Sequence, residues 1–364
     1  MKRIDLDDVP AIARGAAVLG AGGGGDPWLG SMMARRAIET HGPVEVVDPS
    51  DVSEDAFALP VAIMGAPTVI VEKAPAGDEH RRTFAAIERA TGNRVTHVAC
   101  MEAGGLNSMT PIVSAAMTGL PLIDGDGMGR AFPELQMVLF GLDGVDCSPM
   151  AMADEKGNTV VLNAADNAWA ERLARAATIE MGCSATIALY PLTGAQVRRS
   201  MVPRTLSHTH EIGWLLERAR AAHLDAAEAL AEHTGGRVIG RAKVVDVERK
   251  TASGFARGRA QLAGTGDCVG RDLTLEFQNE HLIATVDGQV VASVPDLICV
   301  LDADTGEPIT TEAMRYGFRV AVVAMPCNER WRTPEGLALV GPRYFGYDHE
   351  YVPLEQPDRR EAKQ

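Results

Sequence analysis

The densest polar cluster in the sequence follows the apolar run 121–123 and carries residue types suited to acid–base chemistry. Its charged members are Asp124, Asp126, Arg130 and Glu134. Two carboxylates one glycine apart can hold a divalent cation together, or differ in pKa so that one is an acid and the other a base. Arg130 offers a planar fork for the carboxylate of a substrate. The structural alternative is a turn in which Arg130 neutralises the aspartates.

A second candidate segment is Met101-Glu102-Ala103-Gly104-Gly105-Leu106-Asn107-Ser108, which follows a predicted strand and precedes a helix. Open α/β sheets bind ligands beyond the carboxyl ends of their strands. We therefore expect Glu102 and Asn107 to point into such a crevice, although Asn107 or Ser108 can instead cap the helix. The neighbouring Cys100 is either a nucleophile or, more commonly for a cysteine with no basic neighbour, a buried inert thiol.

The glycine-rich segment 20–26 has three alternative interpretations. It contains G-x-G-x-x-G, but a dinucleotide fingerprint requires a preceding strand, and Val9–Leu19 has helical periodicity. The backbone N–H groups around Gly22, Gly23 and Gly24, before the helix that starts near Asp26, can hold a carboxylate or oxyanion. The third alternative is a structural turn that needs glycine for positive φ.

The elements that must position these segments alternate between helix and strand. Helical periodicity covers residues 6–19, about 27–40, 78–90 and 111–117, and short apolar runs predict strands at 44–47, 61–64, 95–101 and 121–123. This alternation predicts an α/β domain with a mostly parallel sheet. The loops after neighbouring strands then share one edge, so we expect one pocket lined by Glu102, Asn107, Asp124, Asp126, Arg130 and Glu134.

The second half of the sequence has a different pattern. Helices are predicted over 205–233, and alternating runs at 273–277, 282–286 and 290–294 are separated by turn pairs such as Asp287-Gly288. This pattern predicts a β-rich α+β domain. We place the domains at 1–167 and 168–355, followed by a frayed polar tail at 356–364.

Composition limits the classes of partner. A chain of 364 residues normally forms two domains, and the formal net charge of −14 opposes binding to nucleic acid or an anionic membrane. The sequence has no apolar stretch long enough to span a membrane and no secretory signal, so we expect a cytoplasmic protein. The six cysteines lack CxxC spacing, which predicts free thiols. His208 and His210 are two residues apart and diverge in a helix, which disfavours metal chelation by this pair.

Four motifs together resemble the S-methyl thiohydantoin desulfurase family, which is associated with hydantoinases. They are the glycine-rich loop at 20–27, the Met-Glu-Ala-Gly-Gly-Leu-Asn-Ser segment at 101–108, the acidic segment at 124–137 and Gly-Pro-Arg-Tyr-Phe-Gly-Tyr at 341–347. Their joint order extends over nearly the whole chain, which makes the resemblance more specific than any one motif.

The resemblance implies a hydrolase that replaces the methylthio group of a five-membered thiohydantoin ring by water and releases methanethiol. Chemistry then suggests roles for the candidate residues. Asp124 and Asp126 are base and acid, or jointly bind a divalent metal, with Glu102 and Glu134 as further carboxylates. Arg130 anchors the substrate carboxylate, Asn107 binds a ring carbonyl, and the loop with Gly22, Gly23, Gly24 and Asp26 closes the pocket.

The alternatives are an accessory subunit of an ATP-dependent hydantoinase or oxoprolinase, and a dinucleotide-dependent oxidoreductase. Whether a metal is bound stays open. We expect a small-molecule substrate, a homo-oligomer and a hydantoinase partner, and no nucleic acid or membrane.

Overall fold

The computed structural model describes residues 1–355 apart from 66–68, 70–72, 74–75 and 253–254. The chain forms two compact units. The N-terminal unit contains Met1–Ala16 and Gly24–Gly213, and the C-terminal unit contains Ala17–Gly23 and Trp214–Gln364. The glycine-rich loop is therefore divided between the units at the Gly23–Gly24 peptide. The predicted tail at 356–364 lies outside the described residues.

The sheet of the N-terminal unit has the strand order β1-β2-β5-β4-β3-β9-β7-β8, and β10 also pairs with β3. The strands are β1 (Arg3–Ile4), β2 (Val44–Val47), β3 (Phe57–Gly65), β4 (His97–Cys100), β5 (Leu122–Ile123), β7 (Met150–Ala153), β8 (Thr159–Leu162), β9 (Ser184–Ala188) and β10 (Leu192–Thr193). The strands β2, β5, β4 and β3 are parallel, and the flanking strands pair antiparallel. The predicted α/β domain with a mostly parallel sheet is confirmed. The candidate residues Glu102 and Asp126 follow its parallel strands β4 and β5.

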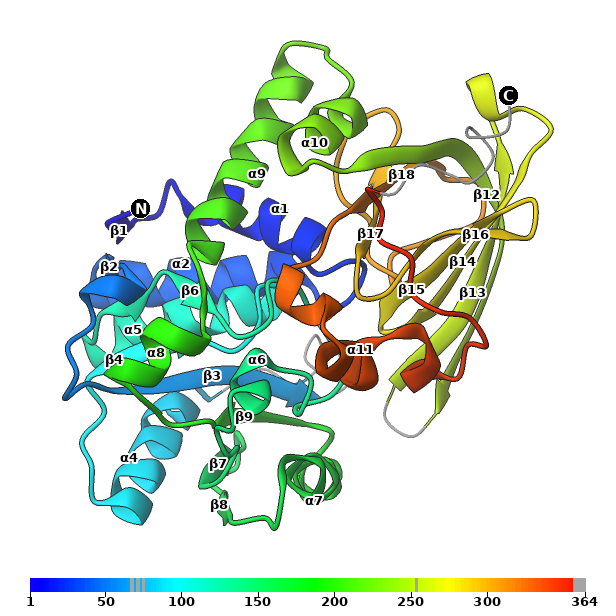
Figure 1. The fold of residues 1–364 in the computed structure, drawn as a ribbon. Helices are drawn as coiled ribbons and strands as arrows, with labels where there is room; N and C mark the ends of the chain where they lie inside the picture. Colours follow the sequence, from blue (N-terminus) through cyan, green and yellow to red (C-terminus); the bar gives the residue numbers. More distant parts are fainter. Residues whose placement is uncertain (66–68, 70–72, 74–75, 253–254, 356–364) are drawn as a thin grey trace. The chain divides into compact units, whose positions relative to one another are not determined.

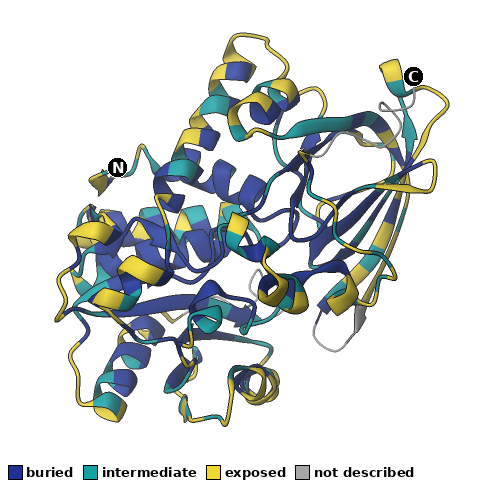
Figure 2. Ribbon diagram, in the orientation of Figure 1, coloured by how far each residue is buried: buried dark blue, intermediate teal, exposed yellow. Residues whose placement is uncertain are grey.

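Helices cover this sheet and close its core. They are α1 (Val9–Leu19), α2 (Pro27–His41), α4 (Glu79–Thr91), α5 (Thr110–Thr118), α6 (Leu139–Leu142), α7 (Asn167–Glu180) and α8 (Gly194–Ser200). Figure 1 shows α2 and α5 side by side above β3, and α5 also contacts β4. Buried apolar residues of α1, α2, α4 and α5 and of the parallel strands belong to one core cluster. Buried residues are dark blue in Figure 2.

Two glycines bring α1 and the start of α9 (Thr205–Ala221) into close contact inside the N-terminal unit. A Cβ atom on Gly15 would lie 1.8 Å from the Thr209 carbonyl oxygen, and one on Gly213 would lie 1.8 Å from the Ala11 carbonyl oxygen. The backbones therefore meet without side chains between them. This contact fixes the beginning of α9, which lies next to the acidic segment.

The C-terminal unit contains an antiparallel sheet in which burial alternates along β13 and β14, whereas β15, β17 and β18 are buried along almost their whole length. Its order is β16-β15-β14-β13-β12-β18-β17. The strands are β12 (Arg237–Ala252), β13 (Phe255–Gly264), β14 (Asp272–Gln278), β15 (Glu280–Val286), β16 (Gln289–Ser293), β17 (Leu297–Asp302) and β18 (Arg319–Met325). The helices α10 (Ala226–Thr234) and α11 (Pro334–Val340) belong to the same unit. This architecture confirms the predicted β-rich α+β domain, including the turn at Asp287-Gly288 between β15 and β16.

Several elements were not predicted from the sequence, among them α7 and the two longest strands, β12 and β13. The 16-residue strand β12 carries many charged residues and two irregularities in register, so its periodicity is broken. The Asp154–Asn158 segment forms the turn between β7 and β8. Among the described residues, no helix has both the length and the hydropathy needed to cross a membrane.

Candidate functional site

The two polar segments of the N-terminal unit leave the same edge of the sheet. Strands β4 and β5 are parallel neighbours, with Val98 opposite Leu122, so the loops that follow them begin side by side. The Gly127 N–H donates to the Met101 carbonyl oxygen at 3.0 Å and joins the two loops. This placement of the loops is the one that the alternating pattern predicts.

Glu102 lies at the centre of this arrangement and is buried. Its Oε1 accepts a hydrogen bond from Asn107 Nδ2 at 2.6 Å, and its Oε2 accepts one from the Phe132 N–H at 3.3 Å. Burial raises the pKa of Glu102 to about 7, and the neighbouring Asp126 charge adds to the rise, whereas the two hydrogen bonds and Arg130 oppose it. Glu102 is therefore a carboxyl group that can give and take a proton near neutral pH.

Asn107 orients Glu102 rather than presenting a free amide. Its Oδ1 accepts from the Ile63 N–H at 2.7 Å, and its Nδ2 donates to the Ile63 carbonyl at 3.2 Å as well as to Glu102. The last residue of β4 is Cys100, which pairs with Val61, so the side chain of Asn107 continues the pairing of β3 beyond the end of β4. The amide that was predicted to bind a ring carbonyl thus has protein partners on both of its polar atoms.

Asp126 links the loop after β4 to the loop after β5 by hydrogen bonds. Its Oδ2 accepts from the Ala103 N–H at 2.6 Å, and both carboxylate oxygens lie 2.9 Å from the Gly129 N–H. The side chain is fully buried, and burial raises its pKa to about 7 despite these hydrogen bonds. Burial therefore raises the pKa of two carboxyl groups on adjacent loops, Glu102 and Asp126.

Asp124 lies in a different hydrogen-bond network, although only one residue separates it from Asp126. It accepts from the Ser207 N–H at 2.9 Å and from the Ser207 hydroxyl, and the Met1 ammonium lies 3.8 Å away. Asp126 lies in β6 (Gly125–Asp126), which pairs with β11 (Val202–Pro203), whereas Asp124 precedes this strand. The contacts of Asp124 thus hold the start of α9 and the N-terminus.

We expect Asp124→Asn to lower stability rather than the rate of the chemical step. The substitution removes the charge that faces the Met1 ammonium and weakens the bonds to Ser207, which should cost about 1–3 kcal/mol of unfolding free energy. Thermal unfolding and kcat measured on the folded fraction test this expectation. A hundredfold loss of kcat at an unchanged melting temperature would instead assign Asp124 to catalysis.

Arg130 and Glu134 are the other charged residues of the acidic segment, and they contact different residues. Arg130 is fully buried, its Nε donates to the Ala131 carbonyl at 2.9 Å, and its guanidinium lies 4.5 Å from the centre of the Phe132 ring. Glu134 accepts a hydrogen bond from Gln136 Nε2 at 2.5 Å. The Arg130 charge lowers the pKa of Glu102, whereas the hydrogen bond between Glu134 and Gln136 lies within their own loop.

The glycine-rich loop contributes to both units by close backbone packing. In the N-terminal unit, the Leu106 N–H donates to the Gly24 carbonyl at 2.9 Å. Asp26 caps α2 by accepting from the Trp28 N–H at 2.8 Å. In the C-terminal unit, Gly22 lies against His281 and Thr311, and Gly23 lies against Glu280. The loop follows the helix α1 rather than a strand, so it lacks the context of a dinucleotide fingerprint.

We expect Gly105→Ala to destabilise the protein more than Gly119→Ala. Both glycines have positive φ, +48° and +69°, but a Cβ atom on Gly105 would lie 2.5 Å from backbone atoms of Gly24 and Gly25, whereas Gly119 faces open space. The shared φ effect should cost about 1 kcal/mol, and the steric conflict at Gly105 a further 1–3 kcal/mol or so. Denaturant unfolding of both variants measures the difference. Equal losses would mean that the contact with Gly24 is not tight in solution.

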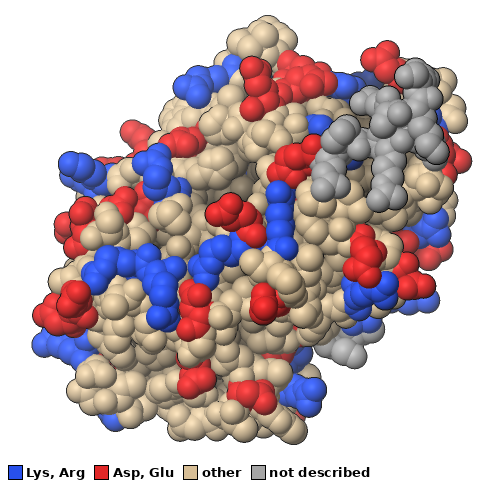
Figure 3. Space-filling view, viewed as in Figure 1, with Lys and Arg blue, Asp and Glu red and all other residues tan. Residues whose placement is uncertain are grey.

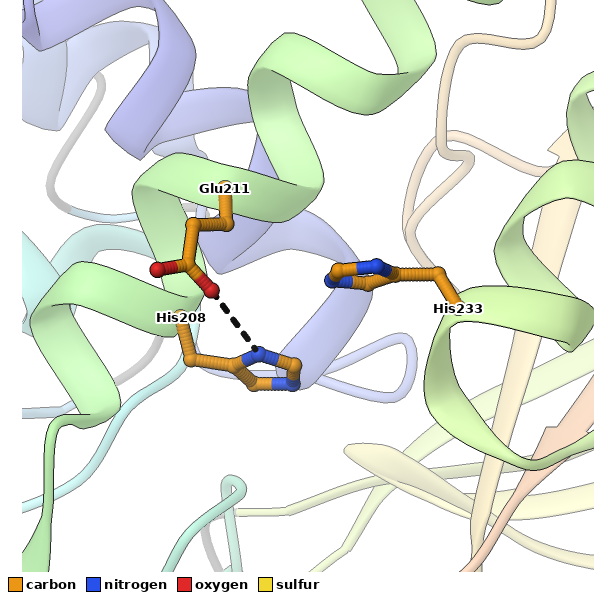
Figure 4. Close-up of side chains that lie close together, drawn as sticks. All are labelled: His208, Glu211 and His233. Carbon is orange, nitrogen blue, oxygen red and sulfur yellow. Dashed lines mark ion pairs between the residues drawn. The ribbon is translucent and has the colours of Figure 1, made fainter.

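Cys100, His208 and His210, which the sequence made less favoured candidates for a nucleophile and metal ligands, have ordinary structural partners. The Cys100 thiol donates to the Glu102 carbonyl at 2.9 Å, and burial, followed by the charges of Asp126 and Glu102, raises its pKa well above the usual range. This environment disfavours a thiolate nucleophile. On α9, His208 Nδ1 lies 4.0 Å from Glu211 (Figure 4), while His210 faces Asp8 at 3.0 Å. The two histidines diverge as predicted, and all six cysteines are free.

A divalent metal does not fit the Asp126 carboxylate. Both oxygens of this group receive backbone N–H groups, from Ala103 and Gly129, and these donors would repel a cation. Asp124 has separate partners and does not join Asp126 as a second ligand. The arrangement is suited to proton transfer between carboxyl groups and a substrate.

Sequence reasoning missed the residues that act through the backbone and those that come from distant segments. The N–H groups of Ala103, Gly129 and Phe132 carry no sequence signal, because every residue type supplies them. A signal did exist for Glu280 and His281, a polar pair at the start of β15, whose remaining residues are mostly buried and apolar. Such a pair on an apolar strand indicates a specific role.

The comparisons with known proteins agree with the motifs. The S-Me-THD-like N-terminal domain matches residues 7–164, and the S-Me-THD-like C-terminal domain matches residues 165–354. A crystal structure of a protein from Chromobacterium violaceum is similar, with a TM-score of 0.79 and 23% identity over 98% of this chain and 100% of that chain. At this identity the likeness concerns the fold alone. A search of curated proteins gave no significant match.

Proposed function

We propose that this chain, which belongs to the S-Me-THD-like family, is a hydrolase that replaces the methylthio group of an S-methyl thiohydantoin by water. One observation carries the proposal on the chemical side. Glu102 is a buried carboxyl group with a pKa raised to about 7, at the carboxyl edge of the parallel strands. A group of this kind donates and accepts protons at the pH of a cell.

The proposed reaction balances as follows. Water adds to the ring carbon of the C=N bond, the π electrons of that bond move to the ring nitrogen, and Glu102 gives this nitrogen a proton. The C–S bond then breaks and its electrons leave with sulfur. The carbonyl of the hydantoin forms as the new hydroxyl returns a proton to Glu102. The attacking water loses its other proton, which ends on the departing sulfur as methanethiol.

The surrounding residues have supporting roles in this proposal. Asn107 orients Glu102, and Asp126 holds the two loops together. Burial raises the pKa of Glu102, the Asp126 charge adds to the rise, and the Arg130 charge limits it. A substrate carboxylate bound by Arg130, and a pocket closed by the loop with Gly22, Gly23, Gly24 and Asp26, remain proposals from the sequence. So do the homo-oligomer and the hydantoinase partner.

A small-molecule substrate is also supported by the surface. Acidic and basic side chains are interspersed on the face drawn in Figure 3, and the net charge of the chain is −14. Nucleic-acid binding relies on clustered Lys and Arg. This distribution favours a small neutral or singly charged ring over a polyanion.

The test is release of methanethiol from an S-methyl thiohydantoin by the purified chain, measured with a thiol reagent. The proposed hydrolase needs neither ATP nor a second protein. An accessory subunit would release thiol only when the hydantoinase is added, and an oxidoreductase would require a nicotinamide or flavin. Either result would overturn the proposal.

A further inference from the structure

Three helices of the N-terminal unit, α2, α4 and α5, border a pocket of about 240 Å³. Its walls are apolar and are formed by Met33 and Ala37 of α2 and by Val113 and Met117 of α5. The volume equals that of roughly eight molecules of liquid water, and it is just below the range of about 300–1,000 Å³ for drug-sized ligands. The pocket therefore has room for a single ring or a short branched chain. The residues that line it differ from those of the candidate site.

His80, at the start of α4, brings a polar atom to this apolar pocket. The side chain lines the pocket although the residue is only 2% exposed. Its Nδ1 lies 2.7 Å from the Ser114 hydroxyl oxygen on α5, so this nitrogen already has a protein partner. Nε2 has no hydrogen-bond partner among the residues that the structure describes. Buried polar groups in proteins normally have a partner, and a polar group of a bound molecule would supply one here.

The chemical state of His80 limits what this partner can be. Burial lowers the pKa of the ring to about 4, although the Glu79 charge opposes the shift, so the imidazole is neutral at pH 7. A neutral imidazole forms a hydrogen bond with a neutral group and does not balance the charge of a buried anion. A hydroxyl group fits best, because it can donate to Nε2 or accept from it.

The opening of the pocket is suited to an anion. Arg36 and His41, near the end of α2, line the pocket and are exposed. The lining formed by the described residues contains no acidic side chain. Within the same part of the chain Arg36 has no ion-pair partner. Its guanidinium is a planar cation that binds carboxylates through two parallel hydrogen bonds, and His41 offers a further polar group beside it.

We propose that this pocket binds a small organic acid with an apolar body and a neutral polar group at the end opposite its carboxylate. The carboxylate lies at the opening beside Arg36 and His41, the apolar body lies against the two methionines, and the neutral group bonds to His80 Nε2. The site uses other residues than the proposed hydrolysis, so its ligand is a second molecule and not the thiohydantoin. Each part of the ligand matches one part of the pocket.

The first test is calorimetric titration of the full-length chain with 4-hydroxybenzoate, whose ring separates a carboxylate from a hydroxyl. We expect saturable binding with a Kd on the order of 0.1 mM. Arg36→Ala should weaken binding about tenfold, because the carboxylate loses its cation. The matched control is Arg89→Ala, which removes the same charge from an exposed position of α4 outside the pocket and should leave the Kd unchanged.

The second test concerns the contact with His80. Benzoate lacks the hydroxyl and should bind the wild-type protein about 3–10-fold more weakly than 4-hydroxybenzoate, which is the net effect of one hydrogen bond. His80→Leu keeps an apolar side chain but loses Nε2, so the preference for the hydroxyl should disappear. If this variant does not fold, ¹⁵N NMR of the wild-type histidines replaces it. The Nε2 resonance of His80 should then shift on addition of 4-hydroxybenzoate.

These measurements do not depend on methanethiol release, so they can fail while the proposed hydrolysis stands, and the reverse. Absence of saturation up to about 10 mM 4-hydroxybenzoate would overturn the inference. So would a Kd of Arg36→Ala equal to that of the wild type, or a preference for the hydroxyl that persists in His80→Leu. In the NMR experiment, an unchanged Nε2 resonance of His80 would overturn it as well.

Discussion

Glu102→Gln should reduce kcat by about 10²–10⁴-fold at neutral pH while the protein remains folded. The amide is close in size to the carboxyl and can still accept from Asn107, but it cannot give a proton to the ring nitrogen. In the wild-type protein, activity should fall as the pH rises through about 7, because burial sets the pKa of Glu102 there and the acid form is lost above it. Steady-state kinetics between pH 5 and 9 or so measure both effects.

The same substitution has a signature in stability that does not depend on the substrate. The pKa of Glu102 in the folded protein lies above its ordinary value of 4.5, so protonation of Glu102 favours the folded state. This stabilisation is fully present below pH 4.5 and is lost as the pH rises through about 7. The total change in unfolding free energy is on the order of 3 kcal/mol. Glu102→Gln should lack this contribution.

The matched control for Glu102 is Glu39→Gln on α2, an exposed glutamate of the same unit. It should preserve both the activity and the pH dependence of unfolding. If Glu102→Gln turns over substrate at the wild-type rate, Glu102 is not the proton donor. If the unfolding free energy of Glu102→Gln depends on pH in the same way as that of the wild type, the pKa of Glu102 is not raised in the folded protein.

Arg130→Ala should give the largest loss of stability among the substitutions in the acidic segment. The guanidinium is fully buried, stacks on Phe132 and bonds to the Ala131 carbonyl, so its removal leaves a cavity and uncompensated acidic charge near Glu102. We expect a loss of about 3–5 kcal/mol of unfolding free energy. Arg130→Lys keeps the charge but not the planar stack, and should lose about 1–2 kcal/mol.

Arg130 also affects the pH profile, because its charge lowers the pKa of Glu102. In Arg130→Ala the alkaline fall of activity should therefore move to higher pH. The control is Arg89→Ala at the exposed end of α4, which should change stability by less than about 0.5 kcal/mol. A stable Arg130→Ala with a raised KM and an unchanged profile would mean that Arg130 binds the substrate carboxylate and does not act on Glu102.

The sequence predicted the part of the site that follows from local pattern and sheet geometry. Strands at 95–101 and 121–123 are short apolar runs, and parallel neighbours place their following loops together, which brings Glu102 near Asp126. The helix leading into the glycine-rich loop was also visible as periodicity. These features depend on neighbouring residues along the chain and on one general rule of α/β sheets.

The remaining features depend on pairings between distant residues. Asp124 and Asp126 are the same residue type and have similar neighbours in the sequence. Asp124 nevertheless contacts Ser207 and Met1, whereas Asp126 accepts hydrogen bonds from backbone amides of the loops. Local periodicity contains no information about which distant strand pairs with Gly125–Asp126. The contact between His281 and Ala21 joins positions that are 260 residues apart, and no spacing rule predicts it.

The most direct test of the proposed hydrolysis follows the oxygen atom. The purified chain is incubated with an S-methyl thiohydantoin in H₂¹⁸O without ATP, nicotinamide or flavin, and the products are analysed by mass spectrometry. The account predicts one methanethiol for each hydantoin, and one ¹⁸O atom in the carbonyl that replaces the methylthio group. Recovery of unchanged substrate, or a product without ¹⁸O at that carbon, would contradict it.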